Sequence, residues 1–106
     1  MAALEADFMV EVDDDHVRRE KSRARELRAS QWWKNKRGSG VCHYCRRQIP
    51  AKSLTMDHVV PIIRGGKSIK SNLVPCCKEC NERKKYLLPV EWQDYLDSLA
   101  KREPHQ

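Results

Sequence analysis

The spacing of apolar and polar residues predicts helices near both ends of the chain and short strands between them. Residues 16 to about 36 contain no glycine or proline, are rich in good helix formers and carry only a thin apolar stripe. We therefore expect one long basic helix there, docked along one edge with the rest in solvent. The acidic run 13–15 offers N-cap oxygens and negative charge at its start. Residues 8–12 form a possible strand.

Prolines and paired glycines divide residues 41–75 into segments that suit short strands and turns. Residues 54–60 have the β-branched content of a strand, and residues 78–88 suit a helix. A last helix is expected from Pro89, a residue tolerated in a first helical turn. Its apolar stripe predicts core packing and consists of Trp92, Tyr95, Leu96 and Leu99.

These elements predict an α+β fold in one compact domain. Residues 1–40 are expected to be a lead-in and a basic helix that packs on or beside the core. Residues 41–106 are expected to form the core and its C-terminal helix. At 106 residues the chain buries little apolar surface. We therefore expect a cross-link, such as a structural metal site, to add to its stability.

The charge of the chain indicates a polyanionic partner. There are 21 Lys and Arg against 15 Asp and Glu, a net charge of +6, and acidic residues crowd the start of the chain. Nucleic acid is the leading partner, and an anionic membrane surface is a distant second. No apolar run approaches the ~20 residues that span a bilayer, and no signal peptide is recognisable. We expect a cytoplasmic protein of bacterial or phage type without membrane association.

Four of the five cysteines form two Cys-x-x-Cys pairs: Cys42, Cys45, Cys77 and Cys80. Disulfides rarely persist in the cytoplasm, whereas two such pairs suit a closed tetrahedral zinc site. The spacer between the pairs is longer than the ~15–20 residues of a simple zinc ribbon, so another structure must loop out between them. Cys76 is expected to be a small buried apolar residue. His43 is a conceivable ligand, but four thiolates already fill the shell.

Between and just after the cysteine pairs lie groups suited to phosphodiester hydrolysis. Asp57 and Asn81 offer hard oxygen donors of the kind that bind Mg²⁺ or Mn²⁺. His58 is a natural general base for water because its unperturbed pKa lies near neutrality. Neighbouring residues on a strand face opposite ways. The strand must therefore end, twist or bulge near Asp57 and His58 if both are to face one phosphate.

The ordered set of motifs resembles the four-cysteine HNH endonucleases over roughly residues 41–86. The resemblance is carried by Cys42-x-x-Cys45, Asp57-His58, Pro61, Arg64-Gly65-Gly66, Asn72-Leu73 and Cys77-x-x-Cys80-Asn81-x-x-Lys84. It implies a small ββα-metal (His-Me finger) core with a four-cysteine zinc site and flanking helices. It also implies a divalent-metal-dependent DNA endonuclease that needs no small-molecule cofactor.

The resemblance further implies a role for each motif residue. Asp57 would ligate a catalytic Mg²⁺ or Mn²⁺, His58 would be the general base, and Asn72 would hold the hairpin loop to the backbone. Asn81 stands where the final histidine of the family name usually does. The chain is therefore an H-N-N variant in which an amide oxygen would complete the cation site. Lys84 would contact a phosphate as a point charge.

Further contacts to DNA are expected from basic residues near the motif and on the first helix: Arg64, Lys84, Lys85, Arg18, Arg19 and Arg23. Such charges can instead form a solvated helix face that contacts no DNA. This alternative applies to Arg83 and Lys85 as well as to the first helix.

Three functions remain open from the sequence. The first is an endonuclease that nicks DNA with low sequence specificity, as a monomer or weak dimer, and leaves 5′-phosphate and 3′-hydroxyl ends as the resemblance implies. The second is a zinc-stabilised nucleic-acid-binding module without activity, which leaves the combination of Asp57, His58 and Asn81 unexplained. The third is a zinc-knit interaction domain of the ubiquitin-ligase kind, which conflicts with the number of ligands and the excess charge.

Overall fold

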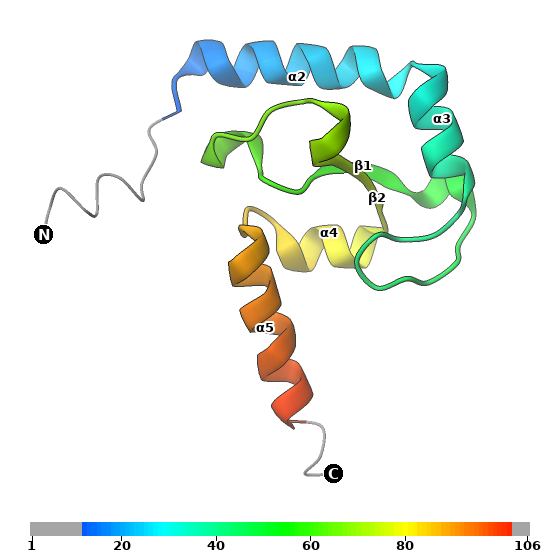
Figure 1. Ribbon diagram of the computed structural model, residues 1–106, viewed down its shortest axis with the longest axis vertical. Coiled ribbons are helices and arrows are strands. Elements are labelled where there is room, and N and C mark those ends of the chain that lie inside the picture. Colours follow the sequence, from blue (N-terminus) through cyan, green and yellow to red (C-terminus); the bar gives the residue numbers. More distant parts are fainter. Residues whose placement is uncertain (1–11, 103–106) are drawn as a thin grey trace, which may run out of the picture.

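A computed structural model describes residues 12–102, so the strand expected at 8–12 lies outside the described residues except for its last position. The helices are α2 (Asp14–Arg28), α3 (Gln31–Gly38), α4 (Lys78–Lys84) and α5 (Pro89–Arg102). Strands β1 (Thr55–His58) and β2 (Leu73–Cys76) form the sheet, and the short 3-10 turns are η1 (Ala51–Ser53), η2 (Ile62–Arg64) and η3 (Lys70–Asn72). In Figure 1, α2 crosses above the hairpin, α4 lies below it and α5 extends away. No helix among the described residues is long and apolar enough to cross a membrane.

The basic segment forms two helices, so the expectation of one continuous helix is wrong. The break lies at Ser30, whose hydroxyl donates to the Leu27 carbonyl at 2.6 Å and accepts from the Trp33 amide at 3.3 Å. A serine hydroxyl that serves both helix ends stabilises the turn between them. The turn places Trp33 in the core at 2% exposure. At the other end of α2, Asp13 is the N-cap and accepts from the His16 amide, as the sequence predicts.

The central unit is an antiparallel hairpin followed by a helix. β1 pairs with β2 in a register that sets Asp57 opposite Val74 and His58 opposite Leu73. β1 ends at His58, so the strict alternation of side chains along a strand stops there. Of the three possibilities that the sequence leaves open, the strand therefore ends. All four residues of β2 are buried, and the strand leads directly into α4, whose N-cap is Cys77.

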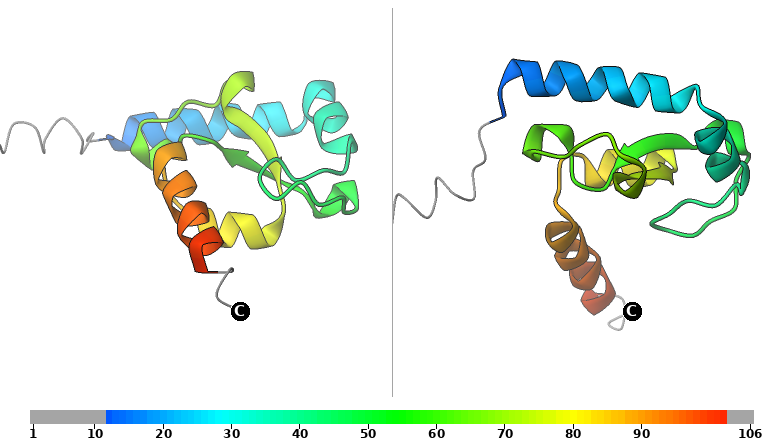
Figure 2. Two further views of the ribbon diagram at one scale, coloured as in Figure 1. Left: turned by 60° about the horizontal axis from the view of Figure 1, so that its bottom comes forward. Right: turned by 45° about the horizontal axis from the view of Figure 1, so that its top comes forward.

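The two C-terminal helices follow the sequence prediction with two differences. The helix expected over 78–88 ends earlier, at Lys84, and α5 begins at Pro89 as expected. Only part of the apolar stripe on α5 is core: Trp92 is 6% exposed and its ring meets the Tyr44 ring edge-on, whereas Tyr95 is 36% exposed. α5 therefore attaches through its first turns and then runs away from the body, as Figure 1 and the right-hand view of Figure 2 show.

α2 docks on the connection between the strands, residues 59–72, through a buried polar contact. Glu20, 2% exposed, accepts from the Ser68 amide through its carboxylate and from the Ser68 hydroxyl through its backbone carbonyl. The hydrogen bond from the Ser68 amide holds the pKa of Glu20 below its usual value despite burial. The same connection folds tightly at Gly66, where a Cβ would lie 1.7 Å from the Val60 carbonyl oxygen. Residue 66 must therefore be glycine.

Candidate active site

The cysteine pairs meet at one end of the hairpin in a metal-binding arrangement. The ligand atoms of Cys42, Cys45, Cys77 and Cys80 all lie within 4.8 Å of one another, and the sulfurs of Cys45 and Cys77 are 3.8 Å apart. Four thiolates bound tetrahedrally at ~2.3 Å would have sulfurs about 3.8 Å apart, so the cluster fits zinc. The first pair lies on a tight turn in which Arg46 has a positive φ of 65°.

Arg47 stabilises negative charge in this cluster. Its guanidinium donates to the sulfur of Cys77 at 3.5 Å and pairs with Glu79 at 3.4 Å. Burial tends to raise the pKa of the Cys45 thiol, but the hydrogen bonds from Arg47 and neighbouring thiols lower it to about 6. A thiolate is the form that ligates a metal. Burial likewise tends to raise the pKa of the Cys77 thiol and hydrogen bonds lower it, whereas burial raises the pKa of the Cys80 thiol, so the thiolate form is favoured at two of the four cysteines.

Two residues near the cluster lie outside it, as expected. Cys76 is fully buried, burial raises the pKa of its thiol, and the thiol donates to the Cys77 carbonyl. It behaves as a small buried side chain. His43 is exposed, and its ring packs against Tyr44.

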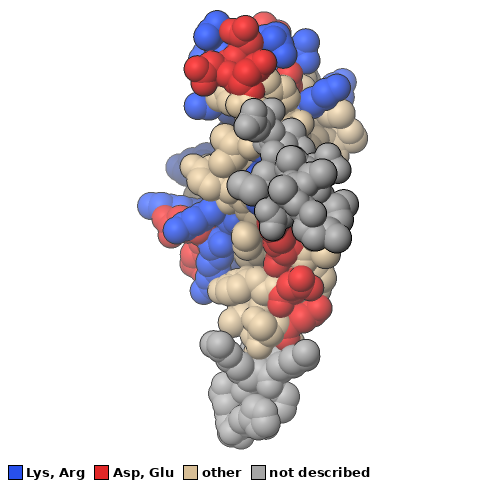
Figure 3. Space-filling view, turned by 90° about the vertical axis from the view of Figure 1, so that its left-hand side faces the viewer, with Lys and Arg blue, Asp and Glu red and all other residues tan. Residues whose placement is uncertain are grey.

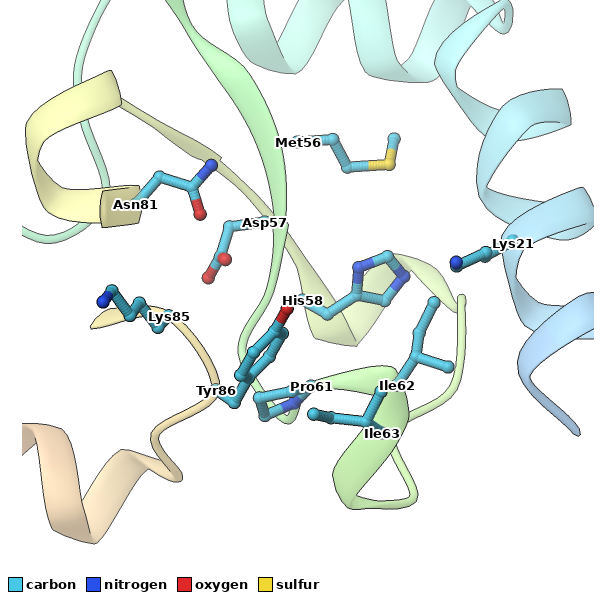
Figure 4. Close-up of a pocket in the computed structure, with 10 residues that line it drawn as sticks. All are labelled: Lys21, Met56, Asp57, His58, Pro61, Ile62, Ile63, Asn81, Lys85 and Tyr86. Atoms are coloured by element: carbon cyan, nitrogen blue, oxygen red, sulfur yellow. The ribbon is translucent and has the colours of Figure 1, made fainter. Parts of the chain in front are cut away.

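Three of the five residues expected at the catalytic centre, Asp57, His58 and Asn81, line one cavity of about 280 Å³ (Figure 4), whereas Asn72 and Lys84 do not. Asp57 and His58 come from β1, Asn81 from α4, and Lys21 reaches the rim from α2. In Figure 4 the amide oxygen of Asn81 points toward the carboxylate of Asp57. The remaining lining is formed by Met56, Pro61, Ile62, Ile63, Lys85 and Tyr86. The hairpin and helix thus bring together residues that are far apart in the sequence.

Asp57 is held from one side by two side chains. Its Oδ2 accepts from the Tyr44 hydroxyl at 2.6 Å and pairs with the Lys84 ammonium at 3.3 Å. Burial and the hydrogen bond to Asp57 both raise the pKa of Tyr44, which keeps its proton on the phenol. Sequence reasoning missed Tyr44, because a tyrosine between two cysteines carries no signal that distinguishes it from a packing residue.

Lys84 does not lie where a phosphate contact requires it. Its side chain is 1% exposed, and its ammonium donates to the His58 carbonyl at 3.1 Å in addition to its ion pair with Asp57. The expectation that Lys84 contacts a phosphate is therefore corrected. Its charge is used inside the protein to compensate a buried carboxylate and to fix the end of β1.

The hydrogen bonds of His58 define its tautomer. His58 Nε2 lies 2.8 Å from the hydroxyl oxygen of Ser68. The Ser68 hydroxyl has one hydrogen and donates it to the Glu20 carbonyl, which can only accept. Ser68 must then accept from His58 Nε2–H, which leaves Nδ1 unprotonated. Burial lowers the pKa of His58 and outweighs the opposing effect of Asp57, so the ring is neutral at neutral pH.

Asn72 braces the connection between the strands. Its Oδ1 accepts from the Val60 amide at 2.9 Å, and its Nδ2 donates to the carbonyls of Val60 at 3.0 Å and Lys67 at 2.9 Å. These bonds tie both ends of the connection to each other immediately after His58.

The basic residues expected to contact DNA occupy very different positions. Arg64 makes a bidentate pair with Glu91 at 3.1 and 3.3 Å and so ties η2 to the start of α5. Arg18 and Arg23 pair with Asp15 and Glu20 within α2, and Arg19 is exposed. Of the six candidates, only Lys85 lines the cavity.

The hairpin, the following helix and the four-thiolate clasp together define a ββα-metal fold, the architecture of a metal-dependent nuclease. The sequence pattern of the HNH endonucleases matches residues 42–94. The chain therefore belongs to the HNH endonuclease family, which implies nuclease activity with DNA as the substrate. The matched segment runs from the first cysteine into α5, so α2 and α3 lie before it. No curated protein matches the chain.

Proposed function

We propose that the protein is a divalent-metal-dependent endonuclease that hydrolyses phosphodiester bonds in DNA. The observation that carries the proposal is the shared cavity in which a carboxylate, a neutral imidazole and an amide meet: Asp57, His58 and Asn81. Water deprotonation and phosphate stabilisation require these groups around one substrate atom. The cysteine cluster lies apart from this cavity, and its role is structural.

The donors at the cavity suit one Mg²⁺ or Mn²⁺ ion held by Asp57 and Asn81. One carboxylate oxygen of Asp57 is taken by Tyr44 and Lys84. The other receives no hydrogen bond from the described residues and stays available. Carboxylate and amide oxygens are hard donors that these ions prefer. When bound, such an ion stabilises the negative charge that develops on the phosphoryl and leaving oxygens.

His58 acts as the general base through Nδ1. The lone pair on Nδ1 accepts the proton from the attacking water, while the Nε2–H bond to Ser68 keeps the ring in one orientation. Lys84 holds the Asp57 carboxylate and the His58 backbone in register. Lys85, exposed at the rim of the cavity, contacts the substrate phosphate. A single site in a monomer cuts one strand, so nicking is the expected outcome.

Relaxation of supercoiled plasmid tests the proposal. Open circles should appear with Mg²⁺ or Mn²⁺, linear DNA should appear only later, and no cleavage should occur without a divalent cation. A plasmid that is bound but never cut, in any cation, would instead identify a zinc-stabilised binding module.

Substitution of Asn81 should change the response to the cation. Asn81→Ala removes one oxygen donor, so the cation concentration for half-maximal nicking should rise at least ~10-fold, the loss seen when even supporting partners of metal sites are removed. Asn81→His should shift the preference toward Co²⁺ or Ni²⁺, because imidazole is a softer ligand than an amide oxygen.

The matched control is Asn35→Ala, since Asn35 is exposed on α3 and, within residues 12–102, its side chain bonds only to that of Gln31. Its cation titration should match that of the wild type. If Asn81→Ala also titrates like the wild type in Mg²⁺ and Mn²⁺, Asn81 is not a cation ligand.

A further inference from the structure

A second cavity lies beside the proposed catalytic one. It has a volume of about 290 Å³ and is lined by Lys21, Ala24, Arg25, Arg28, His58 and Ile62. Lys21, His58 and Ile62 line both cavities, which are therefore neighbours that share a wall. The three basic residues all come from α2, a helix that lies before the segment matched by the family pattern.

These three cations share one side of α2 and carry uncompensated charge. Lys21, Arg25 and Arg28 stand at i, i+4 and i+7, the spacing that aligns side chains along a helix. Among residues 12–102, none of them makes an ion pair, whereas Arg18 and Arg23 do. The N-terminal end of α2, at the top of Figure 3, is in contrast a mixed surface of acidic and basic side chains.

The position of this cationic face is fixed by the fold. The buried contact between Glu20 and Ser68 sets α2 against the strand connection, and Ala24 packs one turn further along. Residues 21, 25 and 28 then border the docked face on the side of His58. Three cations held beside a general base suit the backbone phosphates that accompany the reacting one.

We propose that Lys21, Arg25 and Arg28 each bind one of the backbone phosphates of DNA that lie next to the one that is cut. The proposal rests on the proposed function and assigns the DNA contacts of α2 to residues other than Arg18, Arg19 and Arg23. Phosphate contacts of this kind position a strand without reading its bases. They account for a nuclease that holds DNA with low sequence specificity.

Salt dependence of DNA binding tests the phosphate site without relying on cleavage. Each phosphate contact contributes ~0.9 to the slope of log affinity against log salt for B-form DNA, so the triple variant Lys21→Gln/Arg25→Gln/Arg28→Gln should lose about 2.7 from that slope. Between 50 and 200 mM salt, the wild type should then lose roughly 40-fold more affinity than the variant. Fluorescence anisotropy of a labelled duplex, without added divalent cation, measures this.

The charge-matched control is Arg19→Gln/Lys34→Gln/Lys52→Gln, which removes three exposed cations that line neither cavity. Its slope should change by less than 1. Equal slope changes in both triple variants would show a general effect of charge. That result would overturn the proposed phosphate site, even if the wild type nicks plasmid. If the triple variant does not fold, Arg25→Gln alone must lower the slope by about 0.9. A different outcome is that the wild type never nicks DNA while the triple variant still loses about 2.7 from the slope. That combination would overturn the proposed function and leave the phosphate site standing.

A separate observation concerns the support of His58. Ser68 is 3% exposed and links the imidazole to α2 through two consecutive hydrogen bonds, from His58 Nε2 to the Ser68 hydroxyl and from that hydroxyl to the Glu20 carbonyl. The Ser68 amide is held independently by the Glu20 carboxylate. No motif of the sequence singles out Ser68, because its partner is a backbone carbonyl far away in the chain.

We infer that Ser68 is a positioning residue that keeps the proton of His58 on Nε2 and the lone pair on Nδ1. This inference also rests on the proposed function. Loss of the hydroxyl removes the acceptor that selects this tautomer, so part of the population should carry the proton on Nδ1, where it cannot act as a base.

Ser68→Ala should lower kcat, with KM little changed; loss of the partner that orients a metal-ligating histidine costs roughly 10–100-fold, and a general base that loses its orienting partner should fall by a similar factor. Ring ¹⁵N spectra at neutral pH should show the proton on Nε2 in the wild type and a mixture of tautomers in the variant. Ser68→Thr, which keeps the hydroxyl, should retain the wild-type tautomer. Ser71→Ala, exposed in the same connection, is the control.

A Ser68→Ala variant with wild-type kcat and a single Nε2–H tautomer would overturn the positioning role. The spectra remain decisive even for a protein that does not nick DNA, because they report on the ring and not on turnover. In that case the tautomer assignment stands or falls separately from the proposed function.

Discussion

His58→Ala is expected to abolish almost all plasmid nicking while the protein stays folded. A general base contributes ~10²–10⁴-fold to such a reaction, and no second imidazole lines the cavity. Initial rates of open-circle formation in Mg²⁺ or Mn²⁺ measure the loss. Added imidazole should restore part of the rate, because the substitution enlarges a cavity of about 280 Å³ into which a small base can enter.

His43→Ala is the matched control, since His43 is exposed and lines neither cavity. It should nick DNA at a rate close to that of the wild type. Both variants should contain one zinc ion per chain. If His58→Ala relaxes plasmid as fast as the wild type, the assignment of the general base is wrong.

Cys77→Ala is expected to lose the zinc ion and with it the folded core. Apparent binding energies of structural zinc sites in zinc-finger peptides are ~10–16 kcal/mol, and this energy is folding energy. Cys77 also caps α4, the helix that carries Asn81 and Lys84. A colorimetric chelator should detect no bound zinc in the variant, circular dichroism should show no cooperative thermal unfolding, and the variant should not nick plasmid.

The neighbouring cysteine provides an internal control. Cys76 is also fully buried, yet its thiol lies outside the cluster and bonds to a backbone carbonyl. Cys76→Ala should keep a full complement of zinc and lose only ~1–2 kcal/mol, an ordinary cost for a small change in a core. If Cys76→Ala loses zinc while Cys77→Ala retains it, the assignment of ligands must be reversed.

Local spacing was sufficient to predict the four-cysteine cluster and three residues that line the cavity, Asp57, His58 and Asn81. Each Cys-x-x-Cys pair can present two thiols to one ion, and Asn81 follows Cys80 directly, so the placement of one constrains the other. The N-cap at Asp13 and the helix start at Pro89 were also predictable, because both depend on backbone chemistry within a few residues.

The remaining features depend on contacts that sequence spacing does not contain. Helix propensity across residues 16–36 gave no sign of the break at Ser30, where a hydroxyl that serves two helix ends outweighs propensity. A surface role for Lys84 was plausible from its place on a helix. The Asp57 carboxylate that faces it, however, comes from a strand more than twenty positions earlier. Tyr44 and Ser68 were missed for the same reason.

The rigidity of the connection formed by residues 59–72 affects the rate at which the protein associates with DNA. Asn72 closes its ends, Gly66 lets it fold back on Val60, and Glu20 fastens its middle to α2. The connection therefore loses its conformational entropy when the protein folds and not when DNA binds. Association need not wait for a loop to close over the DNA, and its rate should follow diffusion and electrostatic attraction.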